Sequence, residues 1–363
     1  MQKQPDKHIP VKRMEGAWDA PRRIASVPPP GNAGEPARLR SWNRVLDGAR
    51  RQLDQYISLE PKVLKGRDPE AIHDIRVASR RLQQVLDLIY PHPGPPKIQR
   101  IRRTIRRSRR TLSEVRNCDV LLERARRILV RKRASRRAVW STFQDYVAER
   151  RDRSFRKASR QLSKLNLPAV YLRLQESLAL SIALAGQEDS SGGEANLQQR
   201  IAKSLQETWS VLEGCLKQAH EMPDAASLHA VRIAAKKVRY LIEVIHTLEV
   251  PGSGDAVASL RRLQRHLGDW HDLEVLDEVM LKMVAQPGFL TERLELAMDV
   301  ERLVLRNRKS KVAYVEQFLH MTSSSGEWLG LESWVREYLA GNGIPAQAEA
   351  EESQAPASAF SPA

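Results

Sequence analysis

Two segments of the chain place a histidine and several basic side chains at the same spacing. The first reads HDIRVASRRL from residue 73, and the second reads HAVRIAAKKV from residue 229. In each, an arginine follows the histidine by three positions, and two adjacent basic residues come four and five positions later. Arginine can grip an anion with its planar fork, lysine acts as a point charge, and histidine gains charge beside an anion. The spacing therefore indicates a surface for a polyanionic ligand.

Helix geometry gives this spacing a direction. With about 100° per residue, and Ile72 or Leu228 at the centre of the apolar stripe, the arginine falls near 40° in both copies. The first basic residue of the pair falls near 80° and the histidine near 100°. These side chains flank the apolar stripe, so they can line a cleft between helices. The second basic residue of each pair, Arg81 or Lys237, falls near 180° and is expected to face solvent.

A second pair of segments also repeats, which points to an internal duplication. Residues 112–120 align with residues 267–275, at almost the same offset as the two histidine segments. We interpret the chain as two related helical bundles, residues 38–165 and residues 194–340, joined by a looser segment, residues 166–193.

Periodic apolar residues predict helices nearly throughout residues 38–340. Proline- and glycine-rich breaks separate them near residues 67–69, 91–96, 166–168, 190–193, 222–223 and 251–254. Aromatic residues make up only 5% of the chain, which disfavours a β-sandwich or barrel. Residues 1–37 and 341–363 have the composition of disordered ends. The lack of a long apolar run, the N-terminal sequence and the two cysteines predict a cytoplasmic protein without a membrane span.

The basic charge is concentrated rather than spread evenly. The formal net charge is +16. Residues 97–137 alone contain 17 Lys and Arg against three acids. Like charges at i,i+4, such as Arg102 with Arg106, destabilise a helix by about 0.2–0.5 kcal/mol per pair. A bound polyanion would offset this repulsion.

Taken together, these motifs resemble the CHAD domain, the conserved histidine α-helical domain. The resemblance covers residues 38–340 and rests on the two histidine segments, on the Val115–Val120 segment, and on Leu263–Asp272. It implies an all-α fold of two pseudo-symmetric antiparallel bundles around a basic central cavity. It also implies binding of inorganic polyphosphate. Ser113, Asn117 and His271 depart from the family's usual residues, and the triphosphate-tunnel (CYTH) domain of some members has no counterpart here.

Polyphosphate is a flexible chain of identical charged units, so its binding needs many basic groups and no stacking aromatics. The roles of His73 and His229 stay open among a phosphate contact, a helix-end hydrogen bond and a metal ligand. The expected polyphosphate-binding residues are His73, Arg76, Arg80, Arg81, Arg103, Arg106, Arg107, Arg110, Arg116, His229, Arg232, Lys236, Lys237, Arg239, Tyr240, Arg261, Arg262 and Arg265.

Two other functions compete with polyphosphate binding. A nucleic-acid or generic polyanion-binding protein would explain the net charge, although residues 97–137 contain no Phe, Tyr or Trp for base stacking. A metal-dependent phosphohydrolase of the His-Asp type would use the doublets at His73 and His271, but Asp74 points away from the histidine stripe. No phosphate-binding glycine loop is present. We therefore expect a non-catalytic protein without cofactor or metal, located in the cytoplasm or at polyphosphate granules, where its ends contact granule proteins.

Overall fold

The computed structural model describes residues 37–66, 68–90, 92–130, 137–185 and 192–344. Across these residues the regular elements are helices and no strand occurs, which confirms the all-α prediction. The predicted disordered ends fall, apart from residues 37 and 341–344, outside the described part of the chain. The helices are α1 (Ala37–Lys65), α2 (Pro69–Ile89), α3 (Pro96–Thr111), α4 (Ser113–Leu129), α5 (Arg137–Ser163), α6 (Leu167–Ala185), α7 (Gly192–Glu221), α8 (Ala225–Thr247), α9 (Ser253–Val284), α10 (Phe289–Glu292), α11 (Leu294–Ser323) and α12 (Gly326–Gly341).

The two signature helices, α2 and α8, begin with equivalent caps. Asp68 accepts hydrogen bonds from the backbone N–H groups of Glu70 (3.0 Å) and Ala71 (3.2 Å). Asp224 accepts from the N–H of Ser227 (2.7 Å) in a reciprocal capping box. Such caps satisfy the otherwise unpaired first N–H groups of a helix. Each signature histidine therefore lies five residues after an aspartate cap, at the same helical phase.

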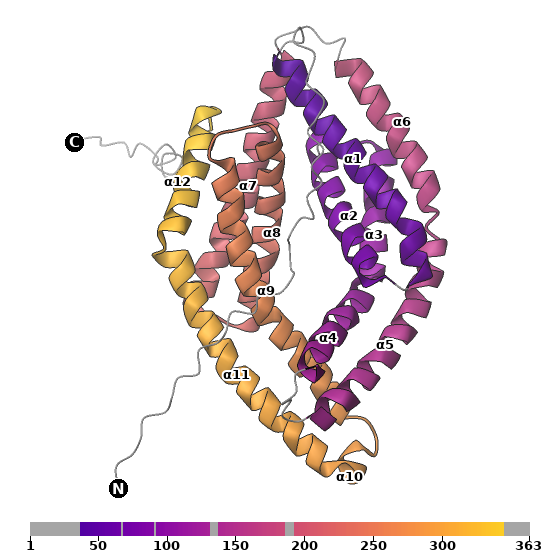
Figure 1. The fold of residues 1–363 in the computed structure, drawn as a ribbon. Coiled ribbons are helices and arrows are strands. Elements are labelled where there is room, and N and C mark those ends of the chain that lie inside the picture. The colour runs from indigo at the N-terminus through magenta and orange to yellow at the C-terminus, as the bar shows by residue number, and fades with distance from the viewer. Residues whose placement is uncertain (1–36, 67, 91, 131–136, 186–191, 345–363) are drawn as a thin grey trace, which may run out of the picture. The chain divides into compact units, whose positions relative to one another are not determined.

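The pairs α1–α2, α4–α5, α7–α8 and α8–α9 form antiparallel hairpins (Figure 1). Hairpins from both parts of the sequence share one core. The largest buried cluster contains Leu86 of α2, Leu174 of α6, Leu241 of α8 and Leu260 of α9. A second cluster joins α4 and α5 to α9 and α11. Because apolar residues of both predicted bundles fill common cores, we expect them to unfold together. The internal duplication itself stays a prediction.

The segment between the predicted bundles is not a loose linker. It contains α6, which packs against α1 and buries Leu174 and Leu178 completely. Its sequence, LPAVYLRLQESLALSIALA, is apolar enough to supply a face for the core. Packing of that face favours a helix here despite the break at Asn166–Pro168. The prediction of a looser segment was therefore wrong for Leu167–Ala185.

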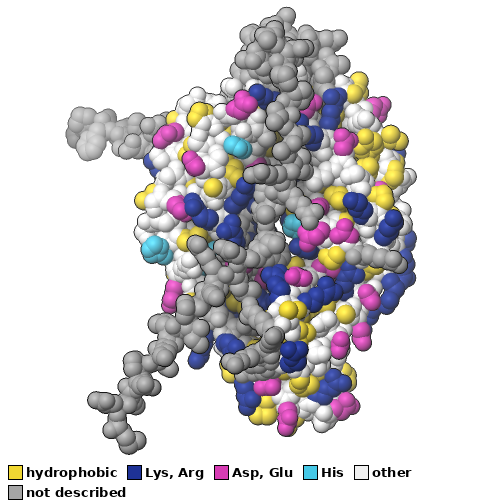
Figure 2. All heavy atoms as spheres, viewed as in Figure 1, with side chains coloured by type: hydrophobic (Ala, Val, Ile, Leu, Met, Phe, Trp, Pro, Cys, Tyr) yellow, Lys and Arg dark blue, Asp and Glu magenta, His cyan; other side chains and the backbone are white. Residues whose placement is uncertain are grey.

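The outer surface of the described helices is mixed in charge. Figure 2 shows Lys and Arg side chains interspersed with Asp and Glu over the face in view. Within the described residues no helix combines the length and hydropathy needed to cross a bilayer. A concentrated basic region is found instead inside a cleft between helices.

Candidate functional site

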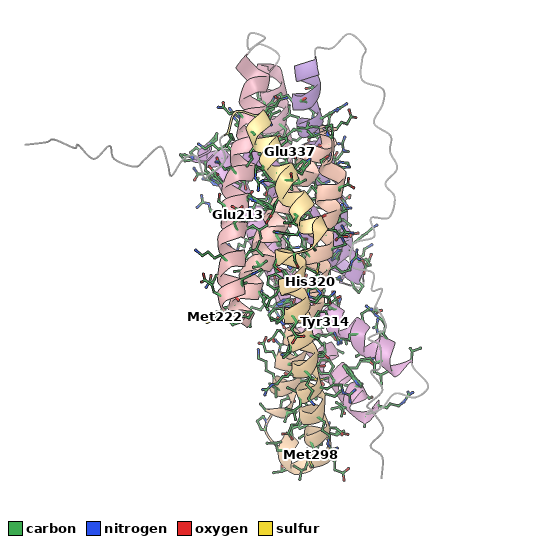
Figure 3. The ribbon with its side chains drawn as sticks, turned by 90° about the vertical axis from the view of Figure 1, so that its left-hand side faces the viewer. Glu213, Met222, Met298, Tyr314, His320 and Glu337 are labelled. Atoms are coloured by element: carbon green, nitrogen blue, oxygen red, sulfur yellow. The ribbon has the colours of Figure 1, made fainter. Side chains whose placement is uncertain are left out.

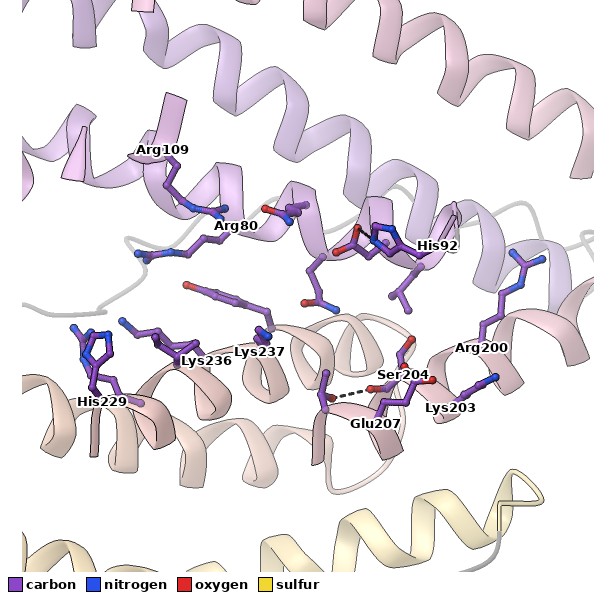
Figure 4. Close-up of a pocket in the computed structure, with 18 residues that line it drawn as sticks. Arg80, His92, Arg109, Arg200, Lys203, Ser204, Glu207, His229, Lys236 and Lys237 are labelled. Carbon is purple, nitrogen blue, oxygen red and sulfur yellow. Dashed lines mark hydrogen bonds and ion pairs between the residues drawn. The ribbon is translucent and has the colours of Figure 1, made fainter. Parts of the chain in front are cut away.

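A cavity of about 790 Å³ opens between α2, α7 and α8, with the end of α3 at its edge. Its volume lies in the range of clefts that hold whole ligands. Figure 4 shows Arg80 and Arg109 on one side, facing His229 and Lys236 on the other. The described lining includes two acids, Asp87 and Glu207, against seven cationic residues: Arg80, Arg109, Arg200, Lys203, Arg232, Lys236 and Lys237.

Helix α8 turns its predicted basic stripe toward this cavity, whereas α2 contributes Arg80 of its stripe but neither His73 nor Arg76. From α2 the lining takes Arg80, and from α8 it takes His229, Arg232 and Lys236. Successive turns of α8 bring these three side chains to one face, next to the buried apolar stripe that contains Val231 and Val238. Tyr240 closes the α8 side of the cavity. The predicted angles thus place residues from two distant segments on facing walls.

The cationic groups of the cleft repel one another. Burial lowers the pKa of Arg232. The charge of Asp272 raises it, and the charge of Arg80 on the facing helix lowers it again. Burial and the charges of Arg80 and Arg106 lower the pKa of Arg109 to about 10. The buried Nε of Arg232 has no acceptor among the described residues. A buried donor without an acceptor, in a cluster of like charges, favours an anionic ligand.

Arg76 lies under the cleft instead of lining it. Its guanidinium donates hydrogen bonds to the backbone carbonyl oxygen of Arg109 (2.6 Å) and to Ser113 Oγ (2.9 Å). Burial, followed by the charges of Arg80, Arg109 and Arg116, lowers its pKa to about 9. Arg76 therefore holds the α3–α4 corner in place and lies outside the lining of this cavity, and its contact with ligand stays a prediction.

Three other predicted binding residues converge on one carboxylate, that of Glu243. Its oxygens lie 3.3 Å from Arg81 Nε, 3.8 Å from Arg239 Nε and 3.0 Å from Arg261 Nη2. Arg81 and Glu243 line a smaller cavity of about 290 Å³, and Tyr240 lines both this cavity and the main cleft. These three arginines are thus engaged in an ion-pair cluster that joins α2, α8 and α9. Their helical phase alone could not show that an acid would face them.

The remaining predicted residues divide by position. Tyr240 lines the cleft, and the guanidinium carbon of Arg239 lies 4.8 Å from the centre of its ring. Arg262 pairs with Glu327 at 2.7 Å. Arg116 Nη1 approaches the carbonyl oxygen of Pro69 at 3.5 Å. The others lie outside the described lining, half-buried or exposed: His73, Arg103, Arg106, Arg107, Arg110 and Arg265.

Lys237 was predicted to face solvent, and three other cationic lining residues were not predicted from the sequence: Arg109, Arg200 and Lys203. Lys237, expected to face solvent, lines the cleft because α7 packs beside α8 and extends the wall there. Arg109 lines it although its neighbours Arg107 and Arg110 do not. Arg200 and Lys203 come from α7, at the end of the cleft away from His229 (Figure 4). The helical spacing of the polar residues 200, 203, 204, 207 and 208 is the signal that could have identified this wall.

The two His-Asp doublets do not assemble a metal site in the described residues. The rings of His229 and His271 lie 5.3 Å apart between centroids. Burial and the charge of Arg232 lower the pKa of His271 to about 3. In the described ranges no group of three or more His, Cys, Asp or Glu side chains is placed to hold a metal ion. The phosphohydrolase alternative therefore has no ligand set in this part of the chain.

Fold and cleft define an all-helical protein whose two signature helices face a cationic cavity. The chain belongs to the CHAD domain family, whose domain matches residues 47–281. Among solved structures, it is similar to the CHAD domain from the plant Ricinus communis, with 22% sequence identity and a TM-score of 0.53. That alignment covers 82% of this chain and 91% of the plant domain, and at this identity it supports the fold alone. No curated protein matches the chain.

Proposed function

We propose that this protein binds inorganic polyphosphate in the cleft between α2, α7 and α8, without catalysing a reaction on it. The observation that carries the proposal is the lining itself, in which seven Lys and Arg side chains from four helices surround one cavity. Internal phosphates of polyphosphate each carry one negative charge, so a linear chain would satisfy many of these cations at once. The family resemblance, which implies polyphosphate binding, supports the same ligand.

Arg232 has the strongest individual claim to contact the ligand. It is largely buried, its Nε has no acceptor among the described residues, and it faces Arg80 across the cleft. A phosphate oxygen between the two guanidinium groups would satisfy that donor and screen the repulsion. Recruitment to polyphosphate-containing granules in the cytoplasm would follow from such binding.

Generic polyanion binding, including nucleic acid, is the second candidate function. The observation that favours it is the exposed basic face of α3, where Arg103, Arg106, Arg107 and Arg110 lie outside the cleft. Open helix faces of this kind bind any polyanion through sequence-independent charge neutralisation. The two candidates therefore use different surfaces of the same molecule.

Competition binding separates the two candidates. Bound, labelled long-chain polyphosphate is challenged with unlabelled duplex DNA, single-stranded RNA or heparin at about 150 mM salt, where exposed charges are largely screened. We expect polyphosphate to resist displacement by the other three at equal charge. Displacement of polyphosphate by all three competitors at equal charge would contradict a dedicated cleft and make generic binding the leading function.

Polyphosphate affinity should rise as the pH falls from 7.5 to 5.5. Burial raises the pKa of Asp272 to about 6, while Arg232, Arg124 and Lys236 lower it and Asp269 raises it. Below this pKa the carboxyl group is neutral and no longer competes with the ligand for Arg232. Removing one negative charge a few ångströms from the ligand in a wet cleft is worth about 1 kcal/mol, or roughly fivefold in affinity.

The variant Asp272→Asn isolates this contribution. It should bind about fivefold tighter than the wild type at pH 7.5 and respond much less to pH, as measured by titration calorimetry with long-chain polyphosphate. Burial and the charge of Arg232 lower the pKa of His271 to about 3, so this histidine contributes little in the window, and they lower the pKa of His229 as well. An unchanged pH response in Asp272→Asn would assign it to another group.

A further inference from the structure

One face of α11 carries an apolar stripe that no described helix covers. Leu294, Met298, Leu305 and Val312 are 60%, 46%, 48% and 58% exposed. At about 100° per residue these four side chains lie within roughly 40° of one another. The face that packs on the core, with Val300 and Phe318, lies roughly 120° away around the helix. Figure 3 shows α11 along the middle of the outer face, with Met298 near its lower end.

The charges beside this stripe are divided along the helix. Glu292, at the end of α10, starts an acidic half that continues through Glu295, Asp299 and Glu301; the one base within it, Arg293, lies over the Phe289 ring. A basic half follows, made of Arg302, Arg306, Arg308 and Lys309. Most of these side chains are exposed, and where the two halves meet Asp299 pairs with Arg302 at 3.1 Å. Lys311 is excluded from the basic half because it bonds Glu274 and Asp277 of α9.

This division makes the face complementary to its own antiparallel copy. A two-fold axis near residue 303 would place Leu294 of one chain opposite Val312 of the other. The acidic half of each helix would then face the basic half of its partner. In such an isologous pairing, the same acidic-to-basic contact occurs twice, as the two-fold symmetry of a closed dimer requires. A membrane surface fits less well, because anionic headgroups would repel the acidic half.

We propose that two copies of this chain associate through α11, with the two helices antiparallel and the apolar stripe at the centre of the interface. The stripe spans 19 residues, about 27 Å of helix, which is long enough for several turns of side-chain packing. None of its residues lines the cleft, and α11 follows the residues that match the CHAD domain. The proposal therefore stands independently of polyphosphate binding.

Sedimentation velocity of the full chain over a range of concentrations tests this pairing. We expect a dimer that Leu294→Ser with Leu305→Ser converts to a monomer. The matched control is Leu172→Ser with Leu180→Ser, which removes equally exposed leucines from α6 and should leave the dimer intact. Circular dichroism confirms that each variant is folded.

A charge-exchange experiment tests the orientation. The first variant, Glu295→Lys with Glu301→Lys, and the second, Arg308→Glu with Lys309→Glu, should each be mainly monomeric because like charges then face each other. Mixed together they should form a heterodimer. A wild-type monomer at all concentrations, or a dimer unaffected by these changes, overturns the proposal. Monomers that bind phosphatidylserine vesicles through the stripe would assign this face to a membrane instead.

Discussion

Replacing Arg80, Arg232 and Lys236 together by glutamine should weaken polyphosphate binding by at least about 100-fold. Hydrogen bonds to charged groups contribute about 1.5–3 kcal/mol each where they are shielded from water. These three side chains line facing walls of the cleft, and the substitutions remove their three positive charges from it. The slope of log affinity against log salt should also fall by about two. Fluorescence anisotropy with labelled long-chain polyphosphate at several salt concentrations measures both quantities.

The matched control removes the same charge from outside the cleft. Arg103, Arg107 and Arg110 are exposed on α3, and their triple replacement by glutamine should lower affinity less than about fivefold at 150 mM salt. Loss of the repelling cleft cations should leave the fold intact or raise its melting temperature, which separates lost binding from unfolding. Equal losses in the two triple variants would place the ligand on the open surface of the protein.

Glu243→Gln should lower the free energy of unfolding by about 2–4 kcal/mol. The Glu243 carboxylate is 15% exposed and pairs with Arg81, Arg239 and Arg261, which come from three helices. Removing one partner of a buried ion pair costs about 3–5 kcal/mol, and the partial exposure of Arg81 and Arg261 reduces this. Urea denaturation followed by circular dichroism gives the change.

Glu327→Gln is the control for this ion-pair cluster. Glu327 pairs with Arg262, and both side chains are about half exposed, so its loss should cost no more than about 1 kcal/mol. The release of Arg81 and Arg261 in Glu243→Gln should also increase salt-sensitive binding to heparin. If Glu243→Gln and Glu327→Gln are equally mild, the cluster does not hold the two parts of the molecule together.

Much of the fold could be predicted because it depends on short-range rules. The Asp68 and Asp224 caps set where α2 and α8 begin, and the fixed rotation per residue then puts Arg80, Arg232 and Lys236 beside the apolar stripe. The proline- and glycine-rich breaks coincide with helix ends. The α6 segment was misjudged because its break at Pro168 outweighed its apolar face in the prediction.

Residue types and their spacing were enough to predict the helices, their basic stripes and the sign of the charge. Which cations share the cleft depends on how the helices pack against one another. Arg76 and Arg80 differ by one turn, yet one supports the α3–α4 corner and the other lines the cavity. Arg81 and Lys237 occupy matched positions, yet Arg81 meets Glu243 while Lys237 faces the cleft beside α7. The direction in which a side chain leaves its helix depends on the local sequence. The partner that packs against each helix face depends on contacts between residues far apart in the chain.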